Sequence, residues 1–132
     1  MEAVDTLAAS IRKGAVRVDA GLIDDAAGQG IAVFYLNGRS IHTKKDFFRA
    51  ARDVMKLPDY FGGNWDAFEE CINDLSWLPA RGYILVYENT SPFFSGNPDD
   101  ERILKEILHD ARENHGQEGV PFEFILTAES LS

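Results

Sequence analysis

Four carboxylates gather on one short segment of the chain. Asp66, Glu69, Glu70 and Asp74 fall on the same side of a helix, because successive residues turn by about 100°. A pair such as Asp66 and Glu70 has the chemistry for general acid–base catalysis. On an exposed helix the carboxylates stay solvated and ionised, so the separation of pKa values that such catalysis needs is not expected. The segment therefore predicts either a solvated acidic face or a surface that binds something cationic.

Other catalytic chemistry has little support in the sequence. There is no glycine-rich phosphate loop and no zinc-type spacing, and His42, His109 and His115 are scattered. Cys71 borders an apolar stripe, which predicts a buried thiol rather than a nucleophile. We therefore predict no catalytic residues, no metal and no cofactor, and interpret the protein as a non-enzyme.

The acidic segment needs a helix and a turn to position it. Pro58 disfavours helix in the residues before it, and Gly62-Gly63 permits a sharp bend. Asn64 is a good N-cap for the helix that follows. The apolar stripe of that helix, with Cys71 at its margin, is expected to be buried and consists of Trp65, Phe68, Ile72 and Leu75.

Three buried strands are predicted around this helix, at residues 31–36, 83–87 and 122–127. Helices are expected over residues 44–56, after a capping box of Thr43 and Asp46, and from Pro98 to about Gly116. Residues 88–97 read as a loop whose Phe93-Phe94 folds back onto the core. Strands separated by helices predict an α/β domain with a small three-stranded parallel sheet.

The first 30 residues are interpreted as an N-terminal extension of a main domain at residues 31–132. Residues 2–13 have helical spacing, with Gly14 as a stop. Residues 15–19 alternate like a short edge strand, and residues 21–30 have room for one helical turn.

Size and charge narrow the class of protein. The 132 residues fit one domain. Acids outnumber bases 22 to 13, for a net charge of -9, which argues against direct nucleic-acid binding and favours basic partners. The single cysteine, and the lack of a signal peptide or a membrane-length apolar run, make a cytoplasmic monomer the expectation.

The segment from Leu57 to Ile72 resembles the barstar family of ribonuclease inhibitors. The family's pattern is met by Leu57, Pro58, Asp59, Tyr60, Phe61, Gly62, Asn64, Asp66, Ala67, Glu70 and Cys71. Looser similarity extends from about Ile31 to Thr127. The resemblance implies a barstar-like fold for this region, in a bacterial protein with a basic ribonuclease as its partner.

The resemblance also implies an interface. Tyr60 and Asp66 occupy positions of an interface tyrosine and aspartate, and Asp110 that of an interface glutamate. Glu70 stands where the family has its most important aspartate, while Glu69 replaces a tryptophan and Asp74 replaces a glycine. The expected partner-binding set is Tyr60, Phe61, Asp66, Glu69, Glu70, Asp74 and Asp110.

The hypothesis is a stoichiometric inhibitor that blocks a basic active-site cleft with carboxylates of one helix, Glu70 centrally and Glu69 nearer the rim. Two alternatives stay open. One is a barstar-like interaction module or toxin-immunity protein with a partner that is not a ribonuclease. The other is an enzyme that uses a carboxylate pair, which an enclosed pocket around Asp66 and Glu70 would favour.

Overall fold

The computed structural model describes residues 2–58 and 61–131. The described elements, in chain order, are α1 (Glu2–Arg12), α2 (Ala20–Gly28), β1 (Ile31–Asn37), the 3-10 helix η1 (Gly38–Ser40), α3 (Lys44–Met55), α4 (Trp65–Asp74), β2 (Gly82–Glu88), α5 (Ser91–Phe94), α6 (Pro98–Gln117) and β3 (Phe122–Thr127).

The three strands form one parallel sheet in the order β1-β2-β3. In register, Ile31 of β1 lies beside Gly82 of β2, and Tyr83 of β2 lies beside Phe122 of β3. The predicted α/β class and the three-stranded parallel sheet are confirmed. Each strand was also located to within a residue or two by its apolar run.

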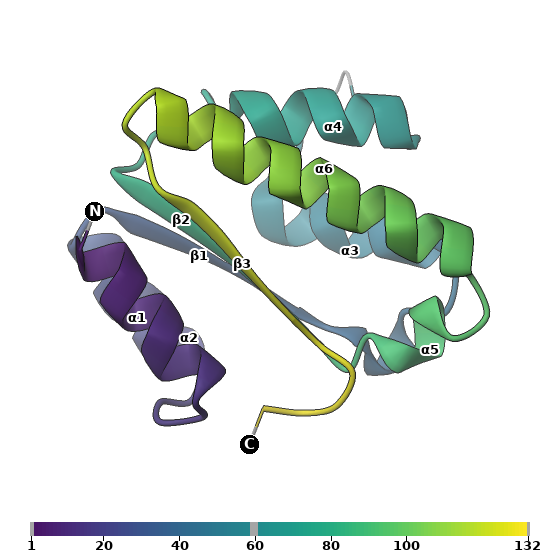
Figure 1. The fold of residues 1–132 in the computed structure, drawn as a ribbon, viewed down its shortest axis with the longest axis horizontal. Helices are drawn as coiled ribbons and strands as arrows, with labels where there is room; N and C mark the ends of the chain where they lie inside the picture. The colour runs from purple at the N-terminus through teal and green to yellow at the C-terminus, as the bar shows by residue number, and fades with distance from the viewer. Residues whose placement is uncertain (1, 59–60, 132) are drawn as a thin grey trace.

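Helices cover both faces of the sheet (Figure 1). On one face, α3, α4 and α6 enclose the larger core, which takes side chains such as Phe34, Leu85 and Phe122 from the strands. On the other face, α1 and α2 enclose a smaller core that includes Val33 and Ile84. Since neighbouring strand residues point to opposite faces, both must be apolar, and this explains the continuous apolar runs.

The regular secondary structure of the first 30 residues consists of the helices α1 and α2. Helix α1 buries Val4, Ala8 and Ile11 against the sheet, and α2 is longer than the single turn expected. The edge strand expected over residues 15–19 is wrong, because this segment is an irregular link between the two helices. Its last residue, Asp19, instead caps α2 by accepting a 2.9 Å hydrogen bond from the backbone N–H of Leu22.

Residues 88–97 also differ from the expectation of a loop. They contain the short helix α5, which has Pro92 in its first turn. The two phenylalanines of α5, Phe93 and Phe94, are buried as predicted, with their rings 5.7 Å apart. The sequence therefore predicts correctly that the two phenylalanines are buried, but a short helix rather than a loop buries them.

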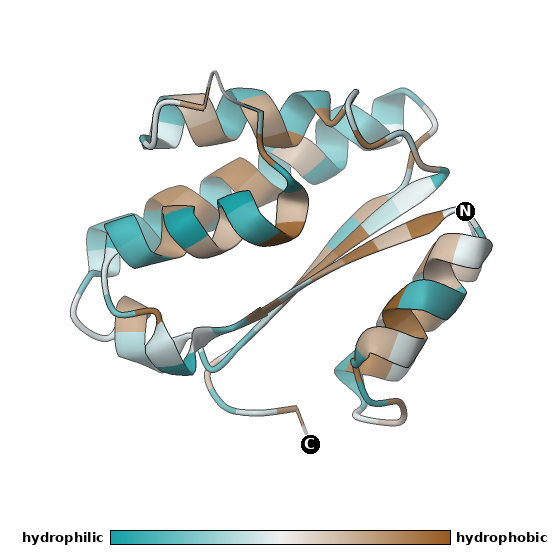
Figure 2. Cartoon of the chain, turned by 180° about the vertical axis from the view of Figure 1, so that it is seen from behind, coloured by the Kyte–Doolittle hydropathy of each residue, from teal (hydrophilic) through white to brown (hydrophobic). Residues whose placement is uncertain are grey.

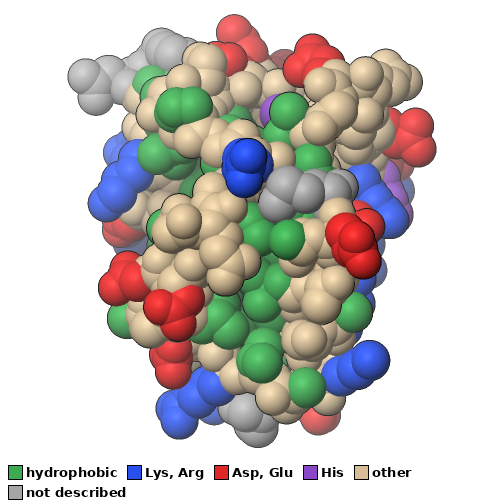
Figure 3. Space-filling view, turned by 90° about the vertical axis from the view of Figure 1, so that its left-hand side faces the viewer, with side chains coloured by type: hydrophobic (Ala, Val, Ile, Leu, Met, Phe, Trp, Pro, Cys, Tyr) green, Lys and Arg blue, Asp and Glu red, His purple; other side chains and the backbone are tan. Residues whose placement is uncertain are grey.

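Two further views show where hydrophobic and hydrophilic residues lie in the fold. Seen from behind, the strands carry hydrophobic residues along much of their length, whereas the helices carry both hydrophilic and hydrophobic residues (Figure 2). The side that carries α1 and α2 has a strip of hydrophobic side chains at its surface (Figure 3). Leu7, Val16 and Leu22 line a hollow between these two helices. None of the helices in the described part of the chain is long and apolar enough to cross a membrane.

Candidate functional site: an acidic groove between two helices

Helix α4 begins as its sequence predicts. The Asn64 side chain accepts a 2.7 Å hydrogen bond from the backbone N–H of Ala67, which confirms the expected N-cap. Phe68, Ile72 and Leu75 are at most 1% exposed. This buried stripe fixes the rotation of α4 and turns its acidic side outward.

Trp65 departs from the expected burial. It is half-buried, and its indole Nε1 donates a 2.9 Å hydrogen bond to Asp100 Oδ1 in the first turn of α6. The ring still packs on Phe48, with centroids 4.8 Å apart. A tryptophan at the first residue of a helix can keep its N–H near the surface, where a polar partner satisfies it.

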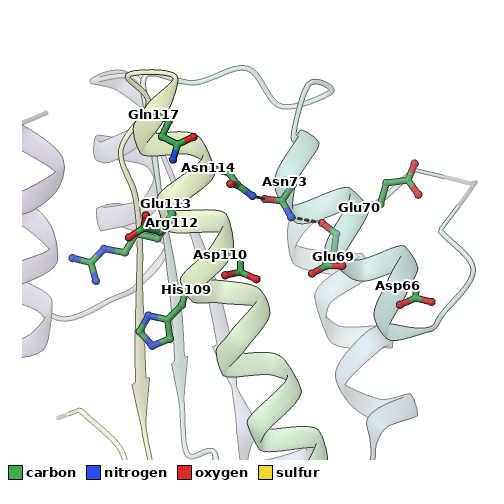
Figure 4. A pocket seen from close by; sticks show the side chains of 10 residues that line it. All are labelled: Asp66, Glu69, Glu70, Asn73, His109, Asp110, Arg112, Glu113, Asn114 and Gln117. Carbon is green, nitrogen blue, oxygen red and sulfur yellow. Dashed lines mark hydrogen bonds between the residues drawn. The ribbon is translucent and has the colours of Figure 1, made fainter.

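An open groove of about 1060 Å³ lies between α4 and α6 (Figure 4). Its lining comes from these two helices and consists of Asp66, Glu69, Glu70, Asn73, His109, Asp110, Arg112, Glu113, Asn114 and Gln117. We call this surface the acidic groove. It includes Asp66 and Glu70, but both are exposed, so the groove does not enclose the carboxylate pair that the enzyme alternative needs.

The charge of the acidic groove is strongly unbalanced. Five carboxylates line it, whereas Arg112 is its one Lys or Arg. The Arg112 guanidinium is directed elsewhere, since its Nε lies 3.4 Å from Glu123 Oε2 on β3. The carboxylates thus create a negative potential across two neighbouring helices that no cation in the lining offsets fully.

Two asparagines hold the walls of the groove together. Asn114 Nδ2 of α6 donates a 2.9 Å hydrogen bond to Asn73 Oδ1 of α4. Asn73 Nδ2 donates in turn to the backbone oxygen of Glu69, at 2.8 Å. Both bonds are drawn in Figure 4. The bridge fixes the spacing between the carboxylates of the two helices.

The predicted carboxylates take different places in this groove. Glu69 and Asp110 lie on the sides of α4 and α6 that face each other, whereas Asp66 and Glu70 line the edge of the groove and point away from α6 (Figure 4). Asp74 is exposed but does not line the groove. The structure therefore places Asp110 of α6 in the same groove as three carboxylates of α4.

Phe61, the described aromatic residue of the expected interface, is not at this surface. Phe61 is 4% exposed and packs on Phe48, with ring centroids 5.6 Å apart. Phe61 is therefore a core residue. Tyr60 lies outside the described residues.

Sequence reasoning missed several residues of the groove. These are Asn73, His109, Arg112, Glu113, Asn114 and Gln117. A signal existed for part of the set, because Asp110, Glu113, Asn114 and Gln117 follow the i, i+3, i+4, i+7 spacing of one helix face. Nothing local indicates which face of α6 lies beside α4.

Two further side chains that could take part in chemistry lie in the core, away from the groove. Cys71 is fully buried, as predicted. His115 is also buried, and its Nε2 lies 2.9 Å from the backbone oxygen of Ile72. Among the described residues, no group of three or more His, Cys, Asp or Glu side chains is placed to hold a metal ion.

Comparison with known families identifies the fold. The family model described as "Barstar (barnase inhibitor)" matches residues 31–127. The chain belongs to the barstar family. The match covers the same region as the resemblance seen in the sequence, and it leaves α1 and α2 outside. The family description names an inhibitor of another protein. Membership of the family therefore implies a protein partner.

A solved structure shares the fold of this barstar-family chain. It is described as "Structure of the Aeropyrum Pernix ORC2 protein (ADPNP-ADP complexes)" and matches with a TM-score of 0.51 and 18% sequence identity. The match covers 84% of this chain but 29% of that one, so this chain spans less than a third of that protein's length. At this identity the likeness concerns the fold alone. No curated protein matches the chain.

Proposed function

We propose that this barstar-family protein is a stoichiometric inhibitor of a ribonuclease and blocks the enzyme's cationic cleft with carboxylates of α4 and α6. The observation that carries the proposal is the acidic groove, in which five carboxylates line one open surface with Arg112 as the only Lys or Arg. A ribonuclease binds a polyanion, so its cleft presents positive charge. Carboxylates on rigid helices occupy that cleft in place of RNA phosphates.

Rigidity matters because ordering flexible groups on binding costs free energy. The buried stripe of α4 and the Asn73–Asn114 bridge hold the groove in place before any partner arrives. Its exposed carboxylates also attract a basic partner over distance, which raises the association rate and makes that rate sensitive to salt.

The first experiment titrates a purified ribonuclease with the chain and follows RNA cleavage. Barnase is the first probe, because the family description names it. Basic ribonucleases encoded beside the gene are the next. A stoichiometric inhibitor abolishes cleavage at a sharp one-to-one endpoint. A protein that inhibits none of these enzymes but binds another partner through the same groove would instead be an interaction module.

The second experiment tests the groove itself by surface plasmon resonance at low and high salt. Glu70→Ala is expected to weaken binding by about 2 kcal/mol or more, mainly through faster dissociation, if Glu70 enters a desolvated cationic pocket. Glu69→Ala and Asp110→Ala test the facing walls of the groove. Glu69→Ala is expected to cost less and to act chiefly on the association rate at low salt.

The matched control is Asp24→Ala, which removes the same charge from exposed α2 on the other face of the sheet. It should change the association rate only slightly. Equal and small effects for all four variants would overturn the proposal and leave the acids as a solvated face.

A further inference from the structure

Helix α3 carries a straight row of cations on an otherwise acidic protein. Lys45, Arg49 and Arg52 follow the spacing i, i+4, i+7, which places them along one side of the helix over about 10 Å. Lys56 follows as the left-handed C-cap of the helix, and all four side chains are exposed. We call these four residues the α3 basic row. Its positive charge favours the binding of a row of anionic groups.

The α3 basic row is weakly neutralised within the molecule. Arg49 Nη1 lies 3.8 Å from Asp46 Oδ1, a distance at the outer limit of an ion pair between exposed groups. The Arg52 guanidinium sits over the Phe61 ring, 5.6 Å from its centroid. Lys45 and Lys56 form no salt bridge with another described residue. The row therefore keeps most of its charge for an external partner.

A hollow of about 450 Å³ runs beside the row. It is lined by Lys44, Lys45, Phe48, Arg49, Arg52 and Gly63. Among the residues that the structure describes, none of those lining the hollow is an acid, and none lies within 4 Å of the place that a side chain of Gly63 would take. An anionic side chain can thus reach the cations from this side without a clash.

The neighbourhood of the row argues against a nucleic-acid strand as its occupant. Gly63 lines the hollow, and Asp66, three residues later, lines the acidic groove. A phosphate backbone that continued past the row would therefore meet carboxylates and be repelled. A protein surface whose anions face the row, and which has no anions opposite the acidic groove, avoids this repulsion.

We propose that the α3 basic row docks into the acidic groove of a second copy of this chain. The row is a helix face with cations one turn apart, and the groove lies between two helices with carboxylates on both walls. The two are complementary in the sign of their charge, and the contact would place a helix face against a groove. On one molecule the two surfaces belong to different helices, and α3 lies behind α6 in Figure 1.

This geometry fixes the type of assembly. A contact between two different surfaces of the same chain is head-to-tail, and it leaves each end with a free row or a free groove, so short chains form rather than closed dimers. The net charge of -9 on each copy opposes the contact. Association is therefore weak, needs high protein concentration and decreases as salt screens the pairing charges.

The consequence is self-masking. A copy whose groove holds the α3 basic row of another copy does not present its carboxylates to a basic partner. A basic protein that binds the groove more tightly disperses the chains. The self-docking itself does not depend on the proposed ribonuclease function.

The test is sedimentation velocity on the full chain over a range of concentrations, at about 20 mM and about 0.5 M salt. The row variant is Lys45→Gln with Arg49→Gln, and the groove variant is Glu69→Gln with Asp110→Asn. The wild type should sediment faster as concentration rises at low salt. Each variant alone should remain monomeric, and an equimolar mixture should stop at dimers, because only one intact row and one intact groove remain.

The matched control is Lys13→Gln with Arg17→Gln, which removes the same charge from exposed residues that follow α1. It should associate as the wild type does. A wild type that is monomeric throughout, or variants that still associate alone, would overturn the proposal. So would binding of a labelled oligouridylate that disappears in the row variant while no self-association is seen, since that result assigns the row to nucleic acid.

Discussion

Asn114 of α6 and Asn73 of α4 join their side chains in a 2.9 Å hydrogen bond across the acidic groove. The bridge lies beside Glu69, whose backbone oxygen also accepts a hydrogen bond from Asn73. The facing carboxylates of the groove are therefore held apart at a fixed spacing, although no bond joins the carboxylates themselves. The uncharged side chains of Asn73 and Asn114 thus help to position the carboxylates of the acidic groove.

The bridge should be measurable by a double-mutant cycle. Asn73→Ala and Asn114→Ala are each expected to lower the free energy of unfolding by about 0.5–1.5 kcal/mol, and the double variant by less than the sum. Urea unfolding of the three variants and the wild type gives the coupling. Gln117→Ala, farther along the same face of α6, is the control. Strictly additive effects would mean that the bridge contributes no stability.

Removal of a core ring should be far more costly. Phe68 is fully buried and contacts the ring of Phe47, with centroids 5.5 Å apart. Phe68→Ala is expected to lower the free energy of unfolding by about 3–5 kcal/mol, because it leaves a cavity. Val16→Ala, at a residue 38% exposed, should have little effect. A urea midpoint that Phe68→Ala leaves unchanged would contradict the docking of α4 described above.

The capping box of α3 predicts a pH dependence. A hydrogen bond from the backbone N–H of His42 is the main cause that lowers the pKa of Asp46 below its usual value of 3.8. Because the pKa is lower in the folded state, the stabilisation exists above the unfolded-state pKa and is lost as pH falls through the folded-state value. The stability difference between the wild type and Asp46→Ala should therefore shrink below about pH 4.

Urea midpoints at a series of pH values measure this difference. Asp53→Ala, an exposed acid of the same helix, is the control and should show no comparable decline. A difference for Asp46→Ala that stays constant from neutral to strongly acidic pH would show that its carboxylate does not cap α3.

An alkaline titration tests the contact between β1 and β2. The pKa of Tyr35 is raised to about 12. Burial is the main cause, and the hydrogen bond to Glu88 is the second. Between pH 10 and pH 12 the unfolded state loses this proton while the folded state keeps it, so stability falls as pH rises. Tyr35→Phe should remove this part of the decline.

Unfolding midpoints of the wild type and Tyr35→Phe, compared from pH 9 to the limit of reversible unfolding, provide the measurement. Tyr83 and Tyr87 also have raised pKa values through burial, and they are common to both proteins, so the comparison isolates Tyr35. Parallel curves for the two proteins would mean that the Tyr35 hydroxyl ionises normally.

Local features of the fold could be predicted from the sequence. β3 occupies residues 122–127 as expected, since an apolar run and its flanking residues define a buried strand. The capping box at Thr43 and the N-cap at Asn64 were also predicted, because each depends on residues within one helical turn. The carboxylates of α4 face outward because its buried stripe is clear in the pattern.

Contacts between distant segments could not be predicted in this way. Asn73 and Asn114 are 41 positions apart, and neither has a local feature that indicates the other. Phe61 lies in a motif that the resemblance relates to an interface, yet it packs in the core. Residues 15–19 alternate like a strand, but backbone pairing with a neighbour decides whether a strand forms, and this segment links two helices instead.

The packing of α1 has a consequence for how the chain is made. Arg12 Nη2 lies 3.2 Å from Glu123 Oε1, so the first helix closes against the last strand, 111 positions later. During synthesis α1 leaves the ribosome long before β3 exists, and its apolar side has no complete sheet to cover. Contacts this distant along the sequence are slow to form. Final assembly must wait until β3 has been synthesised, and we expect this domain to fold as one late step rather than from its N-terminus onward.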